Sequence, residues 1–388
     1  MNASVLKFGG SSFLDPQDYG RVAGHIAGRL AAGEKKIVAV VSAMSGTTGN
    51  LKAVMLDVNK QASPSNIDAA LATGEMLSVC LLEAAVSRLG IPVTSLNGYS
   101  LGICTNSDFG RASLENVDSK PIIAALQAHD VVVAAGGQAI DRSGRLTMLG
   151  RNSSDLTAIV IASMLEENAC EIYSDVPGVY TADPYIVPPA QLIPEIGYGA
   201  IAQMSRHGAK VLHHRAVNYA ERHAVTIVCK SLTGDGAVTG TIVTGHGNAR
   251  SVTVARDAAV IACGSFAERD NLHALLDRHD ISTICTEVND GPSICIVADI
   301  DFAMRLVALT GTRLIFIGSR TVVTEIDSSV LRVHLDGDYE RAISLARQIH
   351  EQMYPGAVDE ISGLRKAKQR SDYSSLLVRE NNAPRNPK

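Results

Sequence analysis

The sequence contains no tryptophan, and aromatic residues make up only 4% of its 388 positions. So few flat rings argue against a stacking platform for single-stranded nucleic acid or for sugars. The net charge is −5, and the charges are spread without long runs of one sign, which disfavours nucleic acid and membrane surfaces as partners. Small molecules are therefore the expected partners.

The sequence also shows few signs of export, membrane insertion, metal binding or disulfide chemistry. No uninterrupted apolar run reaches the roughly 18 to 20 residues of a membrane span. The N-terminus enters an apolar strand without a preceding charged segment, so we expect a cytoplasmic protein. The seven cysteines show no C-x-x-C spacing and mostly lie in apolar runs. We expect buried free thiols instead of zinc sites or disulfides.

The pattern that is present is an alternation of strands and helices. A chain of 388 residues with 46% hydrophobic residues is long enough for two or three globular units, the largest in the N-terminal two thirds. Residues 36–42 and 130–135 are continuous apolar runs, which are typical of parallel strands buried on both faces. Helical stretches separate such runs, so the sequence predicts an α/β unit with a mainly parallel sheet.

The most informative stretch is residues 147–160, where a polar loop that begins at Gly150 passes into an apolar helix. The start of a helix aims backbone N–H groups and a positive helix end at its ligand, so an anion is expected there. Arg151 adds a planar guanidinium suited to a carboxylate or a phosphate. Asp155 adds a carboxylate in the first turn, which can orient a lysine or hold a metal.

Two earlier strands also end in glycine-rich, hydroxyl-rich loops, at residues 9–12 and 42–50. In open α/β sheets ligands bind at the carboxyl ends of the strands. Lys7 precedes the glycines of the first loop, so this loop is not the G-x-x-x-x-G-K-[ST] phosphate motif. Each loop alone has the plainer interpretation of a turn or a helix cap, but two from consecutive strands favour a ligand site.

Three further segments are candidates for the same site. A glycine inside a helix costs about 1 kcal/mol relative to alanine, so Gly74 indicates close packing or a ligand beside Glu75. Glu75 is otherwise a solvated surface charge. Residues 174–184 can bracket an adenine and a ribose, or merely turn the chain. Lys210 lies at a helix start, from which its charge can reach a phosphate, whereas His213 and His214 should face different sides of a helix and make a poor metal pair.

The pattern changes after the linker-like residues 245–250. Two short αβ halves of similar size suggest a duplicated α+β module. The residues after about 362 are polar and charged, and we expect a mobile tail. Strands are expected from Ser251, at 260–263, 283–287, 293–298, 313–317, 321–325 and 330–334, and helices at 267–278, 302–309 and 339–353.

Six blocks, in order and with similar spacing, resemble the aspartate kinases of the amino-acid-kinase family. They are Lys7-Phe-Gly-Gly-Ser-Ser, Val41-Ser-Ala-Met-Ser-Gly-Thr-Thr48, Gly74-Glu75, Leu149-Gly-Arg-Asn-Ser-Ser-Asp155, Ser174-Asp-Val-Pro-Gly-Val-Tyr-Thr-Ala-Asp183-Pro and Gly208-Ala-Lys-Val-Leu-His213. The resemblance implies a three-layer α/β sandwich with a mainly parallel central sheet over residues 1–245. It also implies paired ACT-like α+β modules over 251–355 for regulation and dimerisation, with the tail at 362–388.

The resemblance further implies transfer of the ATP γ-phosphoryl group to the β-carboxylate of aspartate. Lys7 would stabilise the transferring group and Asp155 would orient that lysine, as the catalytic pair. The implied acceptor-binding residues are Arg151 for the α-carboxylate, Glu75 for the ammonium, and Ser42, Thr48 and Ser154 as lining. The implied nucleotide-binding residues are Gly9, Gly10, Ser11, Ser174, Asp175, Tyr180, Asp183 and Lys210, with Mg²⁺ held mainly by the ATP phosphates.

Several residues depart from the family pattern. Ser153 stands where a glycine is usual, and it would be strained if that position needs a positive φ. Tyr185 replaces an arginine of the nucleotide site, and His214 replaces a proline. The segment after Gly264 lacks the Pro-Gly turn that meets an effector, so we expect weak or absent feedback inhibition and a homodimer or higher homo-oligomer formed through the C-terminal region. Two alternatives remain open: a kinase for another amino acid or small acid, and a catalytically weak ligand sensor.

Overall fold

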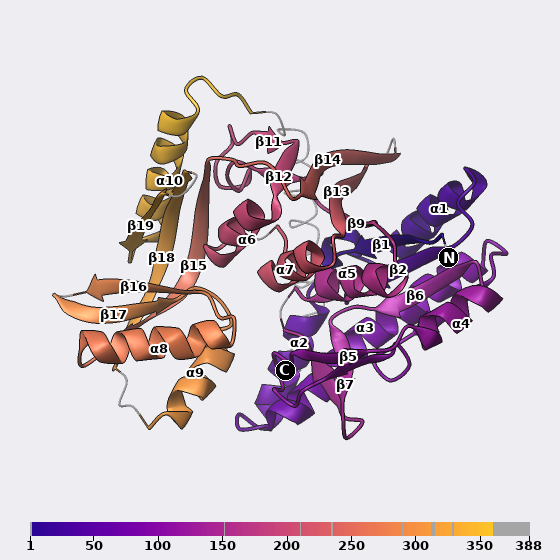
Figure 1. Ribbon diagram of the computed structural model, residues 1–388, viewed down its shortest axis with the longest axis horizontal. Coiled ribbons are helices and arrows are strands. Elements are labelled where there is room, and N and C mark those ends of the chain that lie inside the picture. The colour runs from indigo at the N-terminus through magenta and orange to yellow at the C-terminus, as the bar shows by residue number, and fades with distance from the viewer. Residues whose placement is uncertain are drawn as a thin grey trace, which may run out of the picture.

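The chain forms two units, each built on its own central sheet (Figure 1). The computed structural model describes residues 2–150, 152–209, 211–233, 236–288, 290–311, 315–327 and 330–359. The first unit extends from β1 to β14 and the second from β15 to α10. The last strand of the first unit ends at Thr244 and the first strand of the second begins at Ser251, so the change of sheet coincides with the linker-like segment. The expected tail at 362–388 lies outside the described residues.

An eight-stranded sheet forms the centre of the first unit, in the order β12-β14-β13-β9-β1-β2-β6-β3. Its strands are β1 (Ser4–Phe8), β2 (Ile37–Val41), β3 (Val93–Leu96), β6 (Val131–Ala135), β9 (Ala169–Ser174), β12 (Glu195–Gly197), β13 (Thr226–Thr233) and β14 (Gly236–Thr244). All neighbours are parallel except the pair β13 and β14. Every residue of β2 and β6 is buried, as their continuous apolar sequences predict.

Helices cover both faces of this sheet, which gives three layers. On one face lie α1 (Asp18–Ala31) and α3 (Pro64–Ser87), with Phe8, Tyr19 and Leu82 in the shared core. On the other face lie α4 (Lys120–Ala128), α5 (Ser154–Met164), α6 (Tyr198–Arg206) and α7 (His214–Arg222). Helix α5 is buried from Ser154 to Ala162, because it packs between the sheet and α7. The expected three-layer sandwich is confirmed.

Shorter elements complete the first unit. A four-stranded side sheet has the order β5-β4-β7-β8, and its strands β7 and β8 form an antiparallel hairpin just before the central loop. The bounds of these elements are η1 (Gly10–Ser12), α2 (Thr47–Val58), β4 (Ile103–Thr105), β5 (Leu114–Val117), β7 (Gln138–Asp141), β8 (Leu146–Met148), β10 (Val179–Tyr180) and β11 (Leu192–Ile193).

Helix α3 is the one helix of the described residues that is long and apolar enough, by length and composition, to cross a membrane. It starts after the N-cap Ser63, whose hydroxyl accepts a hydrogen bond from Asn66 N at 3.3 Å, and Pro64 occupies its first turn. It packs against α1, α2, β3, β6 and β8, and it buries Asp68 and Glu75 inside the first unit. Core helices meet the same criteria, and these contacts make α3 a core helix.

The second unit is a five-stranded antiparallel sheet in the order β16-β17-β15-β18-β19. Its elements are β15 (Ser251–Ala262), α8 (Phe266–Arg278), β16 (Thr283–Val288), β17 (Gly291–Ile296), α9 (Ile300–Leu309), β18 (Ile315–Asp327), β19 (Val330–Asp336) and α10 (Tyr339–Met353). Helices α8 and α9 share one apolar cluster with β15 and β17, whereas α10 packs on the other end of β15 and β18. This antiparallel sheet with helices is compatible with ACT-like modules.

The prediction of two similar halves with separate strands needs correction. The strands expected from Ser251 and at 260–263 are one strand, β15, with an irregularity between Ala255 and Ala258. The strands expected at 313–317 and 321–325 likewise merge in β18. The two long strands therefore extend through both halves. Among the described residues, the first half has two helices and the second half has only α10.

The cysteines follow the prediction only in part. All seven are free thiols, and Cys170, Cys229, Cys263 and Cys295 are buried. The expectation of burial is wrong for Cys80 and Cys285, which are exposed. Cys80 lies on the outer side of α3, and Cys285 lies on the edge strand β16, so neither faces a core.

Candidate functional site

The strands of the first unit end level with one another, which brings their following loops together. Phe8 pairs with Val41 and with Tyr173, and Val41 pairs with Ala135, so β1, β2, β6 and β9 share one carboxyl edge. Backbone hydrogen bonds continue this edge, from Gly136 N to Val41 O at 2.9 Å for example. The parallel arrangement therefore places the glycine-rich loops at one end of the sheet, where the sequence predicts the ligand site.

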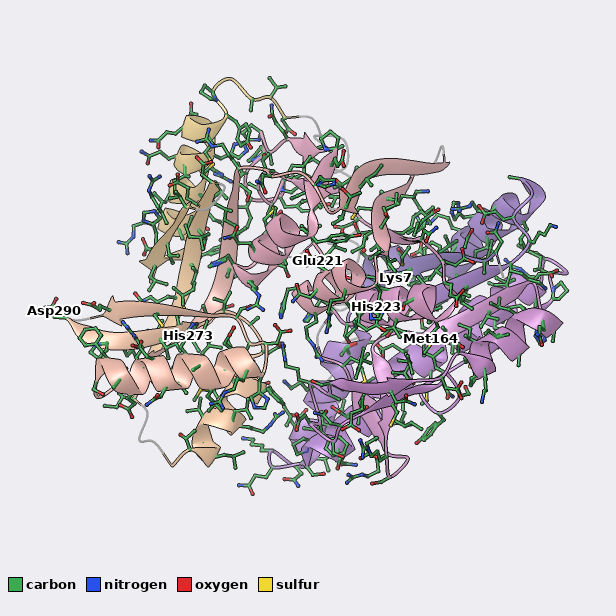
Figure 2. The ribbon with its side chains drawn as sticks, viewed as in Figure 1. Lys7, Met164, Glu221, His223, His273 and Asp290 are labelled. Atoms are coloured by element: carbon green, nitrogen blue, oxygen red, sulfur yellow. The ribbon has the colours of Figure 1, made fainter. Side chains whose placement is uncertain are left out.

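A buried ion pair lies at this edge. Lys7 Nζ of β1 lies 2.7 Å from Asp155 Oδ1 in the first turn of α5, and the two side chains are 12% and 5% exposed. Figure 2 shows Lys7 within the first unit. The two residues are far apart in sequence, and they meet because α5 packs directly on β1. An ammonium held in this way is a fixed positive charge for a phosphoryl group.

Polar groups from β2 and α3 line the space beside this pair. Ser42 Oγ donates a hydrogen bond to Ser154 Oγ at 2.9 Å. Glu75 Oε1 accepts from Ala43 N at 3.3 Å, whereas its Oε2 is buried without a partner among the described residues. Burial raises the pKa of Glu75 to about 7. Glu75 is only 6% exposed, which excludes its interpretation as a solvated surface charge.

Gly74 confirms the expected close packing beside Glu75. A Cβ at this position would lie 3.1 Å from Ala43 Cβ and 3.2 Å from Thr47 Cγ2. The start of α2 can therefore approach α3 only because residue 74 has no side chain. Thr48, the expected acceptor-lining residue, is exposed in the first turn of α2.

The central loop has a conformation that differs from the expectation for Ser153. Gly150 has a φ of 108° and Asn152 a φ of 56°, whereas Ser153 has a φ of −85°. The prediction of strain at Ser153 is therefore wrong, because Asn152 adopts the left-handed conformation, which asparagine tolerates. Ser153 Oγ instead donates to Gly150 O at 2.6 Å and closes the loop. Arg151 lies outside the described residues.

Two side chains that the sequence did not single out hydrogen-bond to the backbone next to this loop, and a third lies beside Gly150. Asp68 Oδ2 accepts hydrogen bonds from Met148 N and Gly110 N, both at 2.8 Å, and burial raises the pKa of Asp68 to about 6. Arg215 donates to Leu149 O at 2.9 Å. The third group is the side chain of Arg111, whose Cγ would lie 3.4 Å from a Cβ on Gly150.

The sequence offered one weak signal for each of two of these residues. Asp68 is an acid inside an apolar helix, and Arg215 is an arginine next to the histidine pair. The positions of their partners depend on tertiary contacts between α3, α7 and β8, which no local pattern reveals. Asp68 and Arg215 are thus supporting residues that a reader of the sequence would pass over.

The nucleotide side of the expected site begins at Gly9 and Gly10. Gly9 N donates to Tyr173 O at 3.3 Å, and a Cβ on Gly9 would lie 3.3 Å from Lys7 Nζ. A Cβ on Gly10 would lie 3.1 Å from Ala43 O. Only residues without a side chain fit at these two positions, and the bare backbone of Gly9 lies beside the Lys7 ammonium. Ser11 is exposed.

The segment after β9 is organised by hydrogen bonds of its own. Ser174 Oγ donates to Val176 O at 2.7 Å, and Tyr185 OH donates to Asp175 Oδ2 at 3.1 Å. Asp183 Oδ1 accepts from Tyr185 N at 2.9 Å. Burial and the charge of Asp175 raise the pKa of Tyr185. A neutral phenol therefore occupies the position where the resemblance predicts a cation.

Another expected nucleotide residue, Tyr180, is buried. Tyr180 is 4% exposed, and its ring packs in an apolar cluster with Val252, Val254 and residues of α10. The structure therefore buries the ring against the second unit and does not present it at the surface of the expected site. Lys210 lies outside the described residues.

The histidine pair does not have the expected geometry. His213 is the N-cap of α7 and accepts a hydrogen bond from Arg215 N at 3.2 Å, so it precedes the helix. The rings of His213 and His214 stack with centroids 4.6 Å apart. The prediction that they face different sides of a helix is wrong for this reason. The described residues contain no group of three or more His, Cys, Asp or Glu side chains placed to hold a metal ion.

Comparisons with known proteins agree with this geometry. The family model described as "Amino acid kinase family" matches residues 2–231. An aspartokinase from Pseudomonas aeruginosa is 38% identical over 223 residues, which cover 58% of this chain and 54% of that protein. An aspartokinase from Thermus thermophilus is 39% identical over 227 residues, covering 58% of this chain and 56% of the relative. The aligned part thus spans about half the length of these relatives.

Solved structures extend the similarity to the fold of both units. E. coli aspartokinase III in complex with aspartate and ADP superimposes with a TM-score of 0.70 at 20% identity, covering 91% of this chain and 100% of that chain. An aspartate kinase from Synechocystis gives a TM-score of 0.56 at 25% identity, covering 83% of this chain and 59% of that chain. With the family model matching more than half of its residues, the chain belongs to the amino acid kinase family.

Proposed function

We propose that this chain transfers the γ-phosphoryl group of ATP to the β-carboxylate of L-aspartate, giving 4-phospho-L-aspartate and ADP. The observation that carries the proposal is the buried pair Lys7–Asp155 at the carboxyl edge of the parallel sheet. The named aspartokinases that match the first unit at 36% to 39% identity support aspartate as the acceptor.

The reaction asks for positioning and neutralisation of charge. A carboxylate oxygen of the acceptor forms a bond to the γ-phosphorus while the bond from phosphorus to the β,γ-bridging oxygen breaks, and ADP leaves with that electron pair. A carboxylic acid with a pKa near 4 is ionised at neutral pH, so no general base is needed. Lys7 neutralises the transferring group, and Asp155 is a positioning residue that fixes the direction of the ammonium.

The acceptor would lie between α3 and the start of α5. The unpartnered, buried Oε2 of Glu75 suits the ammonium of an amino acid, because such a ligand would satisfy it. Arg151 would bind the α-carboxylate, and Ser42, Thr48 and Ser154 would line the pocket. These roles rest on the resemblance and on the positions of the described members of the group.

ATP would approach from the side of Gly9 and Gly10. Their bare backbone beside Lys7 would let a phosphate approach the ammonium closely, with the exposed Ser11 nearby in sequence. Mg²⁺, when bound, would neutralise phosphate charge and would take most of its ligands from the phosphates. The further residues proposed for the nucleotide are Ser174, Asp175, Tyr180, Asp183 and Lys210, of which Asp175 must accommodate the neutral Tyr185 in place of a cation.

The finer properties of the enzyme are part of the proposal. Weak feedback control follows from the absence of a Pro-Gly turn after Gly264. Assembly into a homodimer or higher oligomer through the second unit is supported by exposed apolar side chains of β18, where Ile315 is 62% and Phe316 is 57% exposed. The cytoplasmic location stays a prediction.

The test is a coupled ADP-release assay with ATP, Mg²⁺ and a panel of amino acids and small dicarboxylic acids. We expect turnover with aspartate and a loss of at least about 100-fold in Lys7→Ala, in the range for removal of one charge-stabilising group. Lys36→Ala is a matched control. Lys36 also pairs with an aspartate, Asp130 at 3.1 Å, but it precedes β2 at the opposite end of the sheet, so its loss should leave turnover unchanged.

The outcomes separate the alternatives. Turnover that prefers another acid would replace aspartate as the acceptor while keeping the kinase. No turnover with any acceptor, together with unchanged ATP binding in Lys7→Ala, would favour the ligand sensor and reject the proposal.

A further inference from the structure

Donors of the first unit converge on one residue of the second unit, Asp280, which follows the end of α8. Its carbonyl oxygen accepts from Arg111 Nη2 at 2.6 Å and from His214 Nε2 at 2.9 Å. Its carboxylate accepts from Arg206 Nη2 at 2.7 Å. Asp280 adopts a φ of 59°, which turns its carbonyl and its side chain toward the same neighbouring unit. The carboxylate and the backbone carbonyl of Asp280 thus accept hydrogen bonds from three side chains of the first unit.

Arg111 joins this residue to the helix that follows. Its guanidinium also donates to His279 O and, from Nε, to Asp299 Oδ2 at 2.6 Å. Asp299 is the N-cap of α9, so Arg111 connects the end of α8 with the start of α9. The Arg111 side chain is only 3% exposed, so its contacts with the second unit are buried.

Arg111 is also connected to the central loop, through its neighbour Ala112 and through Arg215. The next residue, Ala112, donates from its N–H to Met148 O at 2.9 Å. Arg215 donates to Leu149 O at 2.9 Å and to Ala112 O at 3.0 Å, while its Nε lies 3.9 Å from Asp280 Oδ2. The contacts therefore form an unbroken path from Asp280 through two arginines to the carbonyl of Leu149.

The charges explain why Asp280 matters to this path. Arg111 and Arg215 are both buried, and burial together with the charge of Arg111 lowers the pKa of Arg215 to about 10. Two guanidinium groups so close repel each other unless carboxylates compensate them. Asp280 and Asp299 are the carboxylates that raise the pKa of Arg215 again. The carboxylate of Asp280, 3.9 Å from Arg215 Nε, therefore offsets part of the repulsion between the two arginines beside Leu149 O.

We propose that Asp280 is a positioning residue for acceptor binding: the end of α8 holds Arg111 and Arg215, and these hold the loop at Leu149 and Gly150 in its binding conformation. The inference rests on the proposed function, because Arg151 of this loop is the proposed partner of the acceptor α-carboxylate. The second unit then contributes to acceptor binding through the position of this loop.

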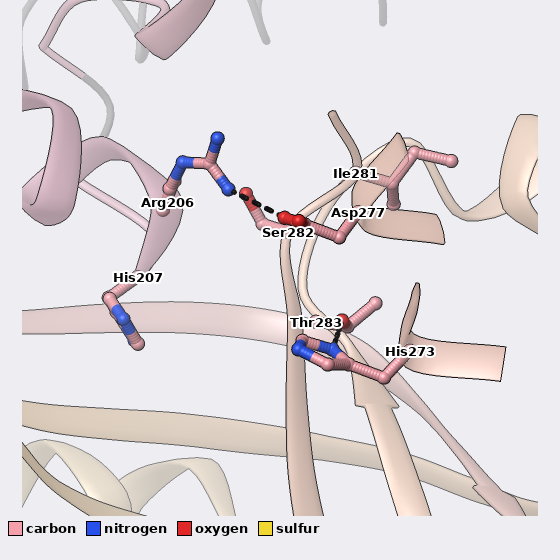
Figure 3. A pocket seen from close by; sticks show the side chains of 7 residues that line it. All are labelled: Arg206, His207, His273, Asp277, Ile281, Ser282 and Thr283. Atoms are coloured by element: carbon pink, nitrogen blue, oxygen red, sulfur yellow. Dashed lines mark hydrogen bonds and ion pairs between the residues drawn. The ribbon is translucent and has the colours of Figure 1, made fainter. Parts of the chain in front are cut away.

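A neighbouring pair supplies a matched control. Arg206 also donates to Asp277 Oδ1 at 3.3 Å. Both residues line a small pocket (Figure 3), whose other lining residues are His207, His273, Ile281, Ser282 and Thr283. Asp277 is 58% exposed and pairs with Arg206, so it lies off the path to Leu149. Asp277→Asn and Asp280→Asn thus remove the same charge from the same helix end, but only the second change touches the proposed path.

The experiment is steady-state kinetics of the full chain for wild type, Asp280→Asn, Asp280→Glu and Asp277→Asn, with each substrate varied in turn. We expect Asp280→Asn to raise the KM for the acceptor by about 10-fold to 100-fold, as a misplaced binding loop would. The KM for ATP should change by less than about twofold, because the nucleotide side is not on the path. Asp280→Glu should recover most of the acceptor affinity, and Asp277→Asn should behave as wild type.

Arg215→Lys is the second variant if Asp280→Asn does not fold, as judged by circular dichroism. Lysine keeps the charge but cannot donate to Leu149 O and Ala112 O with one planar group, so the acceptor KM should again rise selectively. The inference would be wrong, and the proposed function would stand, if the KM values for the acceptor and for ATP rose equally. The same holds if the acceptor KM stayed unchanged in folded variants of an active enzyme. Absence of turnover in the wild type would overturn the proposed function and this inference with it.

Discussion

The helix that begins at the proposed site, α5, and the first helix of the second unit, α8, differ in the hydrogen bonds made at their N-termini. Within the described chain, the N-cap Ser153 of α5 makes no side-chain cap hydrogen bond, and its hydroxyl turns back to Gly150 O. At α8, the N-cap Ser265 accepts from Glu268 N at 3.2 Å, and Glu268 accepts from Gly264 N in return. The cap thus satisfies one first-turn donor of α8, Glu268 N, and the Glu268 side chain is held by the residue before the N-cap.

The difference separates a ligand site from a structural helix start. Both sequences place serines and an acid around a helix start, and both look suited to an anion when taken alone. At α5 the acid, Asp155, turns to Lys7, whereas at α8 the acid, Glu268, folds back onto the backbone of its own helix start. A helix start can bind a ligand only where the chain has not already capped it.

The largest expected effect comes from crowding the start of α5. In Gly136→Ala the new methyl group would lie 2.5 Å from Ser154 Cβ and 3.0 Å from Val41 O. Such overpacking costs roughly 1–3 kcal/mol of unfolding free energy. The displaced first turn should also lower turnover by roughly 100-fold. Urea denaturation and the ADP-release assay measure the two effects.

Gly24→Ala is the control for this change. Gly24 lies in α1, and a Cβ there would meet no atom within 4 Å. Alanine in an exposed helix interior should stabilise the chain by about 0.5–1 kcal/mol and leave turnover unchanged. Wild-type stability and activity in Gly136→Ala would show that the start of α5 is not closely fitted, which would remove the contrast with α8.

The second effect is a pH dependence that belongs to the site alone. Burial raises the pKa of Glu75 from 4.5 to about 7, so the folded chain keeps this proton to a higher pH than the unfolded chain. The stabilisation is therefore complete below about pH 4.5 and is lost as the pH rises to about 7, by roughly 1–3 kcal/mol. Glu75→Gln should reduce this slope in denaturation curves measured between about pH 4.5 and 7.5, leaving the part below about pH 6 that comes from the raised pKa of Asp68.

The same titration should appear in acceptor binding. An ionised Glu75 attracts an ammonium, so the acceptor KM should fall as the pH rises through about 7, and Glu75→Gln should abolish that fall. Glu83→Gln, on the same helix but not buried, should keep both slopes. A Glu75→Gln variant with the wild-type pH profile would argue against a role for Glu75 in the site.

The smallest effect is expected at α8. Ser265→Ala removes the cap hydrogen bond to Glu268 N and should cost about 0.5–2 kcal/mol of unfolding free energy with unchanged turnover. Because the segment after Gly264 lacks a Pro-Gly turn, millimolar lysine, threonine or methionine should inhibit wild type and variant weakly or not at all. Strong inhibition by any of these amino acids would contradict the proposed lack of an effector site at this helix.

Much of the first unit could be predicted from sequence because its signals are local. The apolar runs of β2 and β6, the glycine-rich loops and the apolar helix after Gly150 each follow from neighbouring residues. The second unit was less predictable. Its strands β15 and β18 are longer than their apolar patterns, because an irregularity between Ala255 and Ala258 lets one strand serve both halves.

The site shows the same division. The expected roles of Lys7 and Asp155 agree with the position in which the structure holds them, and Gly74 packs as its helical position predicts. Ser153 was misjudged because the left-handed residue is Asn152, and backbone conformation in a loop depends on contacts that sequence does not display. The orientation of His213 was misjudged because α7 begins only at His214, so His213 precedes the helix.

Local patterns in the sequence were enough to specify a parallel α/β unit with polar loops at one edge and a resemblance that names its chemistry. Only the packing of the two units brought Arg111 to Asp280, a residue 169 positions away, and continued this contact to the carbonyl of Leu149. The physical reason is that the type of each strand, helix and loop follows from neighbouring residues. The partner of a buried charge is set only when two units pack and exclude water between them.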